Sequence, residues 1–520
     1  MLAMFPEERP LYSAGDAFPS GGAFPSGGAY PSGGVFSAGG VFSSEPYSGS
    51  VELEVESRLT LGSTYAQATT IIRSNGKALR NSSSVSHGSS SVSHGVARVR
   101  RDKLNEPLVT GRLLQRIIKQ SFYRAATGLT GATPAWGSLT GIRPAQIAAA
   151  AIESGKTAKS TAKMLTRDYY VSPERAGLCI DAARAALKLK QTIAPRDVAL
   201  YIGIPFCPTR CAYCSFVSNS VEKSFGLIEP FVKTLIREIE AVSAVAKELD
   251  LHVAAVYIGG GTPTALPDEA LKSVMLALKT SFDLSGLREY TVEAGRPDTI
   301  TAPKLEIINR LGAGRICVNP QSMSPEVLVS IGRRHTPDDT RNAVKLVRES
   351  GMALNMDLIA GLPGDTPEGF QHSLDAILAL SPENITVHTL SLKKGSRIML
   401  EGTAIPDGAD VAEMLGHASY SLHGNGYAPY YLYRQKFTSG GFENTGWSLP
   451  GCEGIYNICM MEELCTVLSF GGGGVTKLVS SHSGRIERVF NAKYPREYIL
   501  KSGNVLDKVQ KIREFVSTYC

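Results

Sequence analysis

The sequence has no apolar run long enough to cross a membrane and no large excess of charge of either sign. A membrane-spanning helix needs roughly 20 consecutive apolar residues, so we exclude an integral membrane protein. The 520 residues carry 54 Lys and Arg against 48 Asp and Glu, which gives a net charge of +6. An excess this small argues against a dedicated polybasic nucleic-acid-binding protein, although it leaves a modest preference for anions open.

The first residues lack the basic start and the apolar block of a secretory signal, and early acidic residues argue against a transit peptide. We therefore expect a cytoplasmic protein. Nine cysteines in a long chain without a signal favour a metal site over a disulfide framework. Hydrophobic residues make up 43% of the chain, so most of it can fold around a large core, in roughly three or four domains.

Two segments are of low complexity. Within residues 1–50, aromatic residues recur in units resembling A-F-P-S-G-G, at Phe18, Phe24, Tyr30, Phe36 and Phe42. Gly, Ser and Pro at this density bury too little apolar surface to offset chain entropy, so we predict a disordered arm over 1–50, with self-association as the alternative. The sequence SSSVSHG at Ser82–Gly88 is repeated at Ser89–Gly95 and predicts a flexible linker. Metal binding by the two histidines of the repeats is the alternative there.

The N-terminal region, residues 51–195, combines a strand piece, the Ser-rich linker and a helical part. VELEVESRLTL, within Val51–Ala78, alternates like a half-exposed strand. From Leu104 to Lys190, apolar residues recur three and four positions apart, which predicts helices.

From 196 to 396 the chain alternates between strand and helix patterns. Six strand candidates precede helical stretches: ALYIGIPF, AAVYIGGG, YTVEAG, RICVNPQ, ALNMDLIAG and NITVHTLSL. This alternation predicts an α/β fold with a parallel sheet. Six units are too few for a closed eight-stranded barrel, so we predict an open partial (β/α)6 barrel with its active face at the carboxyl ends of the strands. The alternation of strand and helix patterns ends near Arg397. We predict a smaller C-terminal domain on the substrate side, residues 397–520, that closes over the barrel mouth.

Three cysteines lie in the loop after the first of these strands. Cys207, Cys211 and Cys214 have the spacing C-x3-C-x2-C, which brings three thiolates to one soft metal centre. A tetrahedral zinc ion needs a fourth Cys or His nearby, and none follows. A four-iron cluster held by three cysteines leaves one iron open to an outside ligand, so we predict a [4Fe-4S] cluster on Cys207, Cys211 and Cys214.

The segment IPFCPTRCAYCSF around these cysteines resembles the signature of the radical S-adenosylmethionine (SAM) enzymes, whose fold is a partial (β/α)6 barrel. Together with GGGTPT at Gly259–Thr264 it is similar to the oxygen-independent coproporphyrinogen III oxidase-like branch. The resemblance implies one or two bound SAM molecules. The side chains and glycines that it assigns to cofactor binding are Tyr201, Tyr213, Gly260, Gly261, Thr262, Glu293, Gln321, Arg333 and Asp357.

Several of these residues have a physical interpretation of their own. Glu293 ends a predicted strand, where an acid can receive the ammonium group of a cofactor. Arg333 can bind a carboxylate with two parallel hydrogen bonds, unless it is an ordinary solvated cation. Asp357 lies in an apolar strand, where a buried acid is costly unless it is paired or functional. Gln321 has the alternative of merely satisfying a strand end.

Two segments outside the barrel are similar to one subgroup, the HemZ-type coproporphyrinogen dehydrogenases. They are WGSLTGIRP at Trp136–Pro144 and YLYRQKFTSGGFENTGW at Tyr431–Trp447. The resemblance implies a radical SAM oxidoreductase of haem biosynthesis, in which a 5′-deoxyadenosyl radical starts the decarboxylation of coproporphyrinogen III propionates to the vinyl groups of protoporphyrinogen IX. It also implies an electron donor such as a flavodoxin or ferredoxin, and no nucleic-acid partner.

We assign no catalytic residue, but the four carboxylates of such a substrate predict cations around the pocket. The candidates are Arg143, Lys393, Lys394, Arg397, Arg434 and Lys436, and any of them can instead be an ordinary surface charge. Tyr431, Tyr433 and Trp447 are candidates to pack against the macrocycle or to fill a domain seam.

Two departures from the family pattern leave the branch open. The best-studied oxidases have a further cysteine where this chain has Phe216, and the related haem chaperones lack it too. Those chaperones carry H-N-x-x-Y-W, whereas this chain has Glu443-Asn-Thr-Gly-Trp447 without a histidine, which favours the enzyme. A non-catalytic haem chaperone and a radical SAM enzyme with another substrate are the alternatives. We expect Cys452, Cys459 and Cys465 to be structural thiols in an apolar helix rather than ligands of an auxiliary cluster.

Overall fold

The computed structural model describes residues 35–43, 52–75, 91–214, 219–393 and 395–520. The chain divides into two compact units. Unit 1 takes its described residues from Met1–Gly141 and Lys156–Gly177, and unit 2 consists of Ile142–Gly155 and Leu178–Cys520.

Unit 1 contains a four-stranded antiparallel sheet with one long helix on it. The strands lie in the order β1 (Val35–Ser43), β2 (Glu52–Leu61), β3 (Tyr65–Asn75) and β4 (Ser91–Arg100). Helix α1 (Pro107–Thr130) packs against β3 and β4. A Cβ at Gly95 of β4 would overlap the carbonyl oxygen of Ser121 in α1, so glycine is required where helix and strand cross. The hydroxyl groups of Thr70 and Ser121 form a buried hydrogen bond of 2.8 Å between sheet and helix.

The structure describes parts of both low-complexity segments. Part of the predicted disordered arm 1–50 is the edge strand β1, which pairs along its length with β2. The second Ser-rich repeat, predicted as a linker, leads into β4, and its glycine is the one that α1 approaches. Residues 1–34 and 44–51 and the first Ser-rich repeat lie outside the described residues.

The helical part predicted after Leu104 is confirmed. After α1 come α2 (Pro144–Glu153) in unit 2, α3 (Ala158–Tyr169) in unit 1, and α4 (Pro173–Lys190), which begins in unit 1 and ends in unit 2. Among the described residues, none of the helices is both long and apolar enough to cross a membrane.

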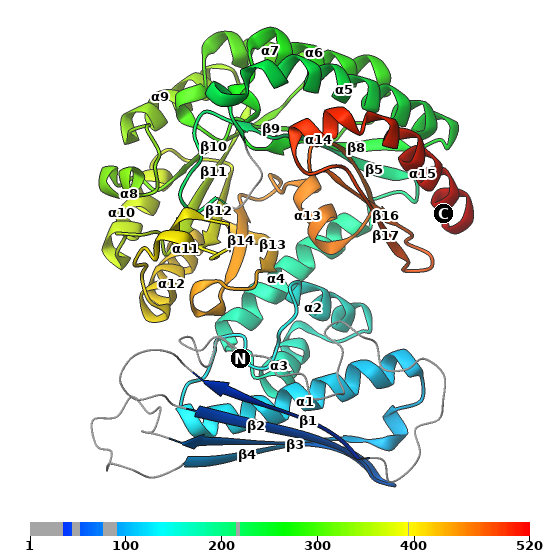
Figure 1. Ribbon diagram of the computed structural model, residues 1–520, viewed down its shortest axis with the longest axis vertical. Coiled ribbons are helices and arrows are strands. Elements are labelled where there is room, and N and C mark those ends of the chain that lie inside the picture. Colours follow the sequence, from blue (N-terminus) through cyan, green and yellow to red (C-terminus); the bar gives the residue numbers. More distant parts are fainter. Residues whose placement is uncertain (1–34, 44–51, 76–90, 215–218, 394) are drawn as a thin grey trace. The chain divides into compact units, whose positions relative to one another are not determined.

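Unit 2 is built on the six predicted strands, all of which are confirmed and lie parallel in chain order (Figure 1). They are β5 (Asp197–Ile204), β8 (His252–Gly260), β9 (Glu289–Glu293), β10 (Arg315–Gln321), β11 (Ala353–Ala360) and β12 (Asn384–Thr389). The connecting helices are α5 (Val221–Glu248), α6 (Asp268–Ser281), α7 (Ala302–Arg310), α8 (Pro325–Ser330), α9 (Pro337–Glu349) and α10 (Pro367–Leu378). Figure 1 shows α5, α6, α7 and α9 along the outer side of the strands. The strands are therefore buried on both faces, which explains their continuous apolar sequences.

The segment predicted as a C-terminal domain, residues 397–520, continues the sheet of unit 2 at both of its edges. After α11 (Arg397–Glu401) and α12 (Gly408–Gly424), strands β13 (Ala428–Arg434) and β14 (Glu443–Ser448) extend the sheet antiparallel beyond β12. Helix α13 (Ile455–Glu462) leads to β15 (Thr466–Gly471), which pairs parallel to β5, and β16 (Val475–Val479) and β17 (Ile486–Phe490) follow. The sheet ends at β13 and β17 and stays open, because these added strands occupy both edges of the barrel.

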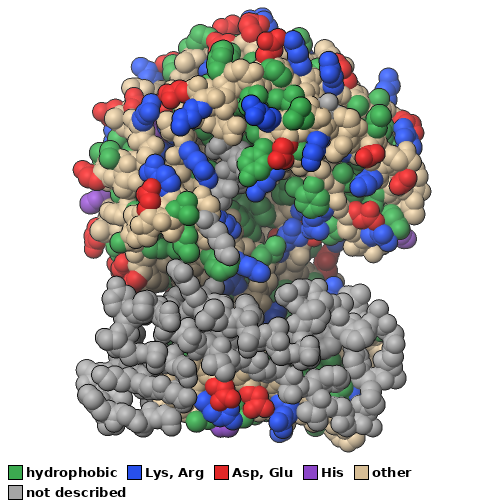
Figure 2. Space-filling model, in the orientation of Figure 1, with side chains coloured by type: hydrophobic (Ala, Val, Ile, Leu, Met, Phe, Trp, Pro, Cys, Tyr) green, Lys and Arg blue, Asp and Glu red, His purple; other side chains and the backbone are tan. Residues whose placement is uncertain are grey.

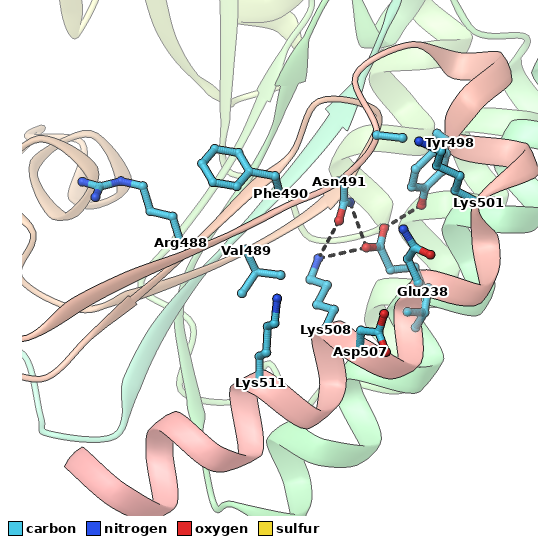
Figure 3. Close-up of a pocket in the computed structure, with 13 residues that line it drawn as sticks. Glu238, Arg488, Val489, Phe490, Asn491, Tyr498, Lys501, Asp507, Lys508 and Lys511 are labelled. Atoms are coloured by element: carbon cyan, nitrogen blue, oxygen red, sulfur yellow. Dashed lines mark hydrogen bonds and ion pairs between the residues drawn. The ribbon is translucent and has the colours of Figure 1, made fainter.

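A buried ion pair fastens the end of the chain to the barrel (Figure 3). Lys508 of α15 (Val505–Tyr519) lies 2.8 Å from Glu238 of α5, and both side chains are almost fully buried. Glu238 also accepts hydrogen bonds from the hydroxyl of Tyr498 in α14 (Pro495–Leu500), at 2.6 Å, and from the backbone N–H of Gly471, at 2.9 Å. This network surrounds a cavity of about 250 Å³ and ties the C-terminal segment to α5.

Candidate functional site

The three predicted cluster cysteines lie in the loop that follows β5. Cys207 is in the short strand β6 (Phe206–Cys207), Cys211 is buried, and Cys214 is half-buried. The backbone N–H of Ala212 donates to the carbonyl of Ile331 at 2.9 Å, which fixes the loop on the end of α8. Within the described part of the chain, no three His, Cys, Asp or Glu side chains gather closely enough for a single metal ion. In a four-iron cluster each cysteine binds a different iron, so the three thiolates need not meet at one metal ion.

Two buried arginines bring positive charge to this loop. Arg296 Nη1 lies 3.7 Å from Cys211 Sγ and donates to Thr209 Oγ1 at 3.0 Å. Arg333 Nη2 donates to the Tyr213 hydroxyl at 3.0 Å. Burial alone would raise the pKa of Cys211, but the charges of Arg333 and Arg296 outweigh it and lower the pKa below its ordinary value. The thiolate, which is the form that binds iron, is therefore favoured.

The glycine-rich loop after β8 lies against the cysteine loop. The backbone N–H of Gly261 donates to Ile204 O at 2.8 Å, and that of Thr262 donates to Phe206 O at 2.7 Å. Thr262 Oγ1 lies 3.5 Å from Cys207 Sγ. Gly260 has φ +108°, a conformation that glycine adopts readily and other residues rarely do. The two loops therefore form one assembly around Cys207.

Gly261→Ala is expected to impair iron incorporation several-fold. A Cβ at this position would lie 2.6 Å from Phe206 O and 2.9 Å from Cys207 Sγ, so the cysteine loop would have to move, at a typical cost of 1–3 kcal/mol for overpacking. Iron and sulfide content after anaerobic reconstitution measures the effect. Gly286→Ala is the matched control, because its Cβ would meet no atom within 4 Å. Equal iron content in the two variants would contradict this account of the loop.

A second group of titratable side chains lies at the ends of β8, β9, β11 and β12. Tyr257 donates to Glu293 Oε1 at 2.5 Å. Burial raises the pKa of Glu293 to about 7; the negative charge of Asp357 adds to the rise, and hydrogen bonds from Tyr257 and the Gly260 backbone partly offset it. Asp357 accepts from Asn355 Nδ2 at 3.0 Å, and its Oδ2 lies 3.6 Å from His388 Nε2.

His388 is the imidazole of this group. Burial lowers the pKa of the imidazole, but the hydrogen bond and charge of Asp357 outweigh burial, and its pKa lies above the ordinary value. Its other ring nitrogen lies 3.3 Å from Asn444 Oδ1 and 3.4 Å from the Tyr433 hydroxyl. Sequence patterns pointed to the two acids but not to Tyr257, His388 or Arg296. A histidine at a strand end opposite an aspartate, and an arginine directly after a strand in Gly-Arg-Pro-Asp, were the available signals.

Several residues near the carboxyl end of β10 and after α8 have buried polar atoms without protein partners among the described residues. Gln321 has φ +71°, unusual for a residue with a side chain, and its Oε1 is buried with no partner among the described residues. Within the same part of the chain, Arg333 Nε and Asn319 Oδ1 are also buried without partners. Buried polar atoms are normally hydrogen-bonded, so these atoms fit a site that is completed by a polar cofactor.

Tyr201 is connected only indirectly to the second group of titratable side chains. Its ring stacks on Tyr257 at 6.4 Å and on Tyr456 of α13 at 5.9 Å, and burial raises the pKa of its hydroxyl. It therefore adjoins Glu293 through Tyr257.

The predicted carboxylate-binding cations that the structure describes have different partners and different exposure. Arg143 forms an ion pair with Glu463, and the Arg434 guanidinium binds the carbonyl of Gly441 at 2.8 Å. Arg397 pairs with Glu401 at 3.5 Å on the surface. Lys393 is half-buried, Lys436 is exposed, and Lys394 and Phe216 lie outside the described residues.

The predicted aromatic candidates separate in the same way. Tyr431 and Tyr433 stack at 6.3 Å, and Tyr433 reaches His388. Trp447 is buried against His423 of α12 instead.

The other cysteines are free thiols. Cys459 and Cys465 are buried as predicted, and Cys452 is half-buried. They do not lie in one helix, because α13 ends at Glu462 and β15 begins at Thr466.

An open sheet of parallel strands with helical crossovers, and a three-cysteine loop at the end of its first strand, define a class of protein that comparisons identify. Residues 201–377 match the radical SAM superfamily. The chain is 40% identical to the oxygen-independent coproporphyrinogen-III oxidase-like protein HemZ of Bacillus subtilis, over 71% of this chain and 75% of the relative. The chain therefore belongs to this HemZ family of radical SAM proteins, and family membership implies a [4Fe-4S] cluster and SAM.

Two other similarities were found. The chain is 32% identical to the heme chaperone HemW of Bacillus subtilis, over 48% of this chain and 66% of the chaperone. The solved structure of coproporphyrinogen III oxidase (HemN) from Escherichia coli matches with a TM-score of 0.48 at 20% identity, over 62% of this chain and 73% of that one.

Proposed function

We propose that the chain decarboxylates the propionate side chains of coproporphyrinogen III oxidatively to vinyl groups, without oxygen, and so forms protoporphyrinogen IX. The observation that carries the proposal is the cysteine loop, held against a glycine loop and flanked by two buried arginines, in a chain 40% identical to a coproporphyrinogen-III oxidase-like protein.

In this proposal Cys207, Cys211 and Cys214 hold the cluster. When bound, the cluster and SAM would supply a 5′-deoxyadenosyl radical able to take one hydrogen atom from the propionate β-carbon; loss of CO2 and of one further electron to an external one-electron acceptor would leave the vinyl group. Arg296 and Arg333 compensate the negative charge of the thiolates and exclude water from them. They act in a buried setting, where charge interactions are stronger than in water.

The chain's remaining polar groups position SAM. Glu293 receives an ammonium group, because a cation at this place lowers the pKa of the carboxyl below its present value of about 7 and keeps it ionised. Asp357 is held by Asn355 and His388 and accepts hydrogen bonds from hydroxyl groups of SAM. Gln321 and Arg333 form hydrogen bonds with SAM through Oε1 and Nε, which have no partner among the described residues. Tyr213 orients Arg333 through its hydroxyl.

The alternative function, haem delivery, is favoured by the identity to a heme chaperone. It is disfavoured at β14, where the position of the chaperone histidine is held by Glu443, buried in the sheet. A buried carboxylate in a fully paired strand offers no imidazole for a haem iron.

The test is anaerobic reconstitution with iron and sulfide, followed by incubation with SAM, a reductant and coproporphyrinogen III. We expect mono- and divinyl porphyrins, identified by mass spectrometry after oxidation, in step with 5′-deoxyadenosine release. A parallel haemin titration separates the alternatives. Tight haemin binding without any vinyl product would overturn the proposed function in favour of the chaperone.

A further inference from the structure

A hollow of about 620 Å³ opens beside the cysteine loop, and the charged residues among its described lining are all cations. They are Arg210, Lys223, Arg334 and Arg397. Each comes from a different part of unit 2: the cysteine loop, the first turn of α5, the segment after α8, and the start of α11. The fold therefore collects positive charge at this place from segments far apart in sequence.

This lining differs from the surrounding surface. Over the visible face of unit 2, basic and acidic side chains are interspersed (Figure 2), so four cations and no acid among the lining residues that the structure describes are a local concentration of positive charge. Arg334 lies 3.8 Å from Glu222, and both side chains are exposed. Exposed pairs of this kind contribute little free energy, so their cations stay available to a partner. The Arg210 guanidinium is oriented by the carbonyl of Gly395, at 2.9 Å.

The hollow lies next to the cluster ligands. Thr209, which also lines it, accepts a hydrogen bond from Arg296 Nη1 at 3.0 Å, and the same nitrogen lies 3.7 Å from Cys211 Sγ. A single side chain thus connects the wall of the hollow to a thiolate. An electron that enters at this wall has a short path to the cluster position.

We propose that this hollow and its cationic rim are the docking surface for an acidic electron-transfer protein that reduces the cluster. The proposal rests on the proposed radical SAM function. One electron leaves the donor and one reaches the cluster, with no bond made or broken. Redox partners form small, weak interfaces, and charge steering sets how fast they meet. Cations spread over four segments, most of them exposed, suit a broad acidic protein surface.

The test reverses charge at Lys223 and Arg334, which are not part of the cofactor site. In Lys223→Glu, Arg334→Glu and the double variant, the rate of cluster reduction by reduced flavodoxin is followed through the loss of cluster absorbance. We expect a fall of about tenfold or more in the double variant, with a weaker salt dependence. Lys233→Glu, on α5 outside the hollow, and Arg310→Glu on α7 are matched controls on exposed cations and should keep the original rate.

Two further measurements separate this proposal from the function on which it rests. Dithionite, a small reductant that needs no docking, should reduce the cluster equally in all variants. Binding of flavodoxin to the iron-free protein, measured by anisotropy, should weaken in the double variant only, so it tests the surface even if the reconstituted protein shows no radical chemistry. Flavodoxin binding and reduction within about twofold of the original in the double variant would overturn the proposal. Binding of inorganic phosphate in the hollow that leaves flavodoxin binding unchanged would also overturn the proposal, since it would assign the hollow to a small anion.

Discussion

Replacement of Cys207, Cys211 or Cys214 by alanine is expected to abolish the iron–sulfur cluster and all SAM cleavage. A cluster held by three thiolates has no spare protein ligand, so loss of one leaves two irons open. The structure shows no substitute: in the part of the chain that it describes, no three or more potential metal ligands lie close together outside this loop or within it. The expected content is about four irons per chain in the unchanged protein, as a single such cluster requires, and close to none in each variant.

The measurement combines iron and sulfide analysis, cluster absorbance and 5′-deoxyadenosine release after anaerobic reconstitution. Cys452→Ala and Cys520→Ala are the controls, because these free thiols are half-buried and exposed and lie far along the chain from the loop. Both should retain the cluster. Full iron content in a variant that lacks all three loop cysteines would refute the assignment.

The barrel strands were predictable because their pattern is local. Each is a short apolar run followed by a helix, and burial on both faces requires such runs. The cysteine loop was predictable for a similar reason, since its spacing is a property of eight consecutive residues. The position of β15 was not, because its pairing with β5 joins residues more than 260 positions apart, and YNICMMEELCTVLSF on its own reads as an apolar helix.

The residues of the site also divide into those with a local signal in the sequence and those without one. Glu293 and Asp357 were recognised because acids in apolar strands are conspicuous. The partners that hold them, Tyr257 and His388, lie on other strands, and only the parallel order of β8, β9, β11 and β12 brings them together. Arg143 illustrates the opposite error. Its charge suggested a role with substrate carboxylates, but the fold places it against Glu463, which no local pattern reveals.

Lys508→Met is expected to lower the free energy of unfolding by about 3–5 kcal/mol, the usual cost of leaving a buried charge without its partner. Glu238 is 1% exposed and would keep hydrogen bonds from Tyr498, Asn491 and Gly471 but lose its only cation in the network of Figure 3. Denaturant or thermal unfolding of the iron-free protein measures the loss. Lys511→Met, on the same helix but exposed at the edge of the cavity, should change stability by no more than about 0.5 kcal/mol.

The double variant Glu238→Gln with Lys508→Met distinguishes charge from packing. Removal of both charges leaves hydrogen-bonding groups but no uncompensated ion. The double variant should therefore be more stable than the sum of the two single losses predicts. The consequence extends to the cofactor site, because Glu238 holds the backbone of Gly471 at the end of β15, and β15 pairs with the strand that leads into the cysteine loop. We therefore expect Lys508→Met also to slow iron incorporation and the double variant to restore it in part. If the single variant unfolds like the unchanged protein, the buried pair does not fasten the C-terminal segment.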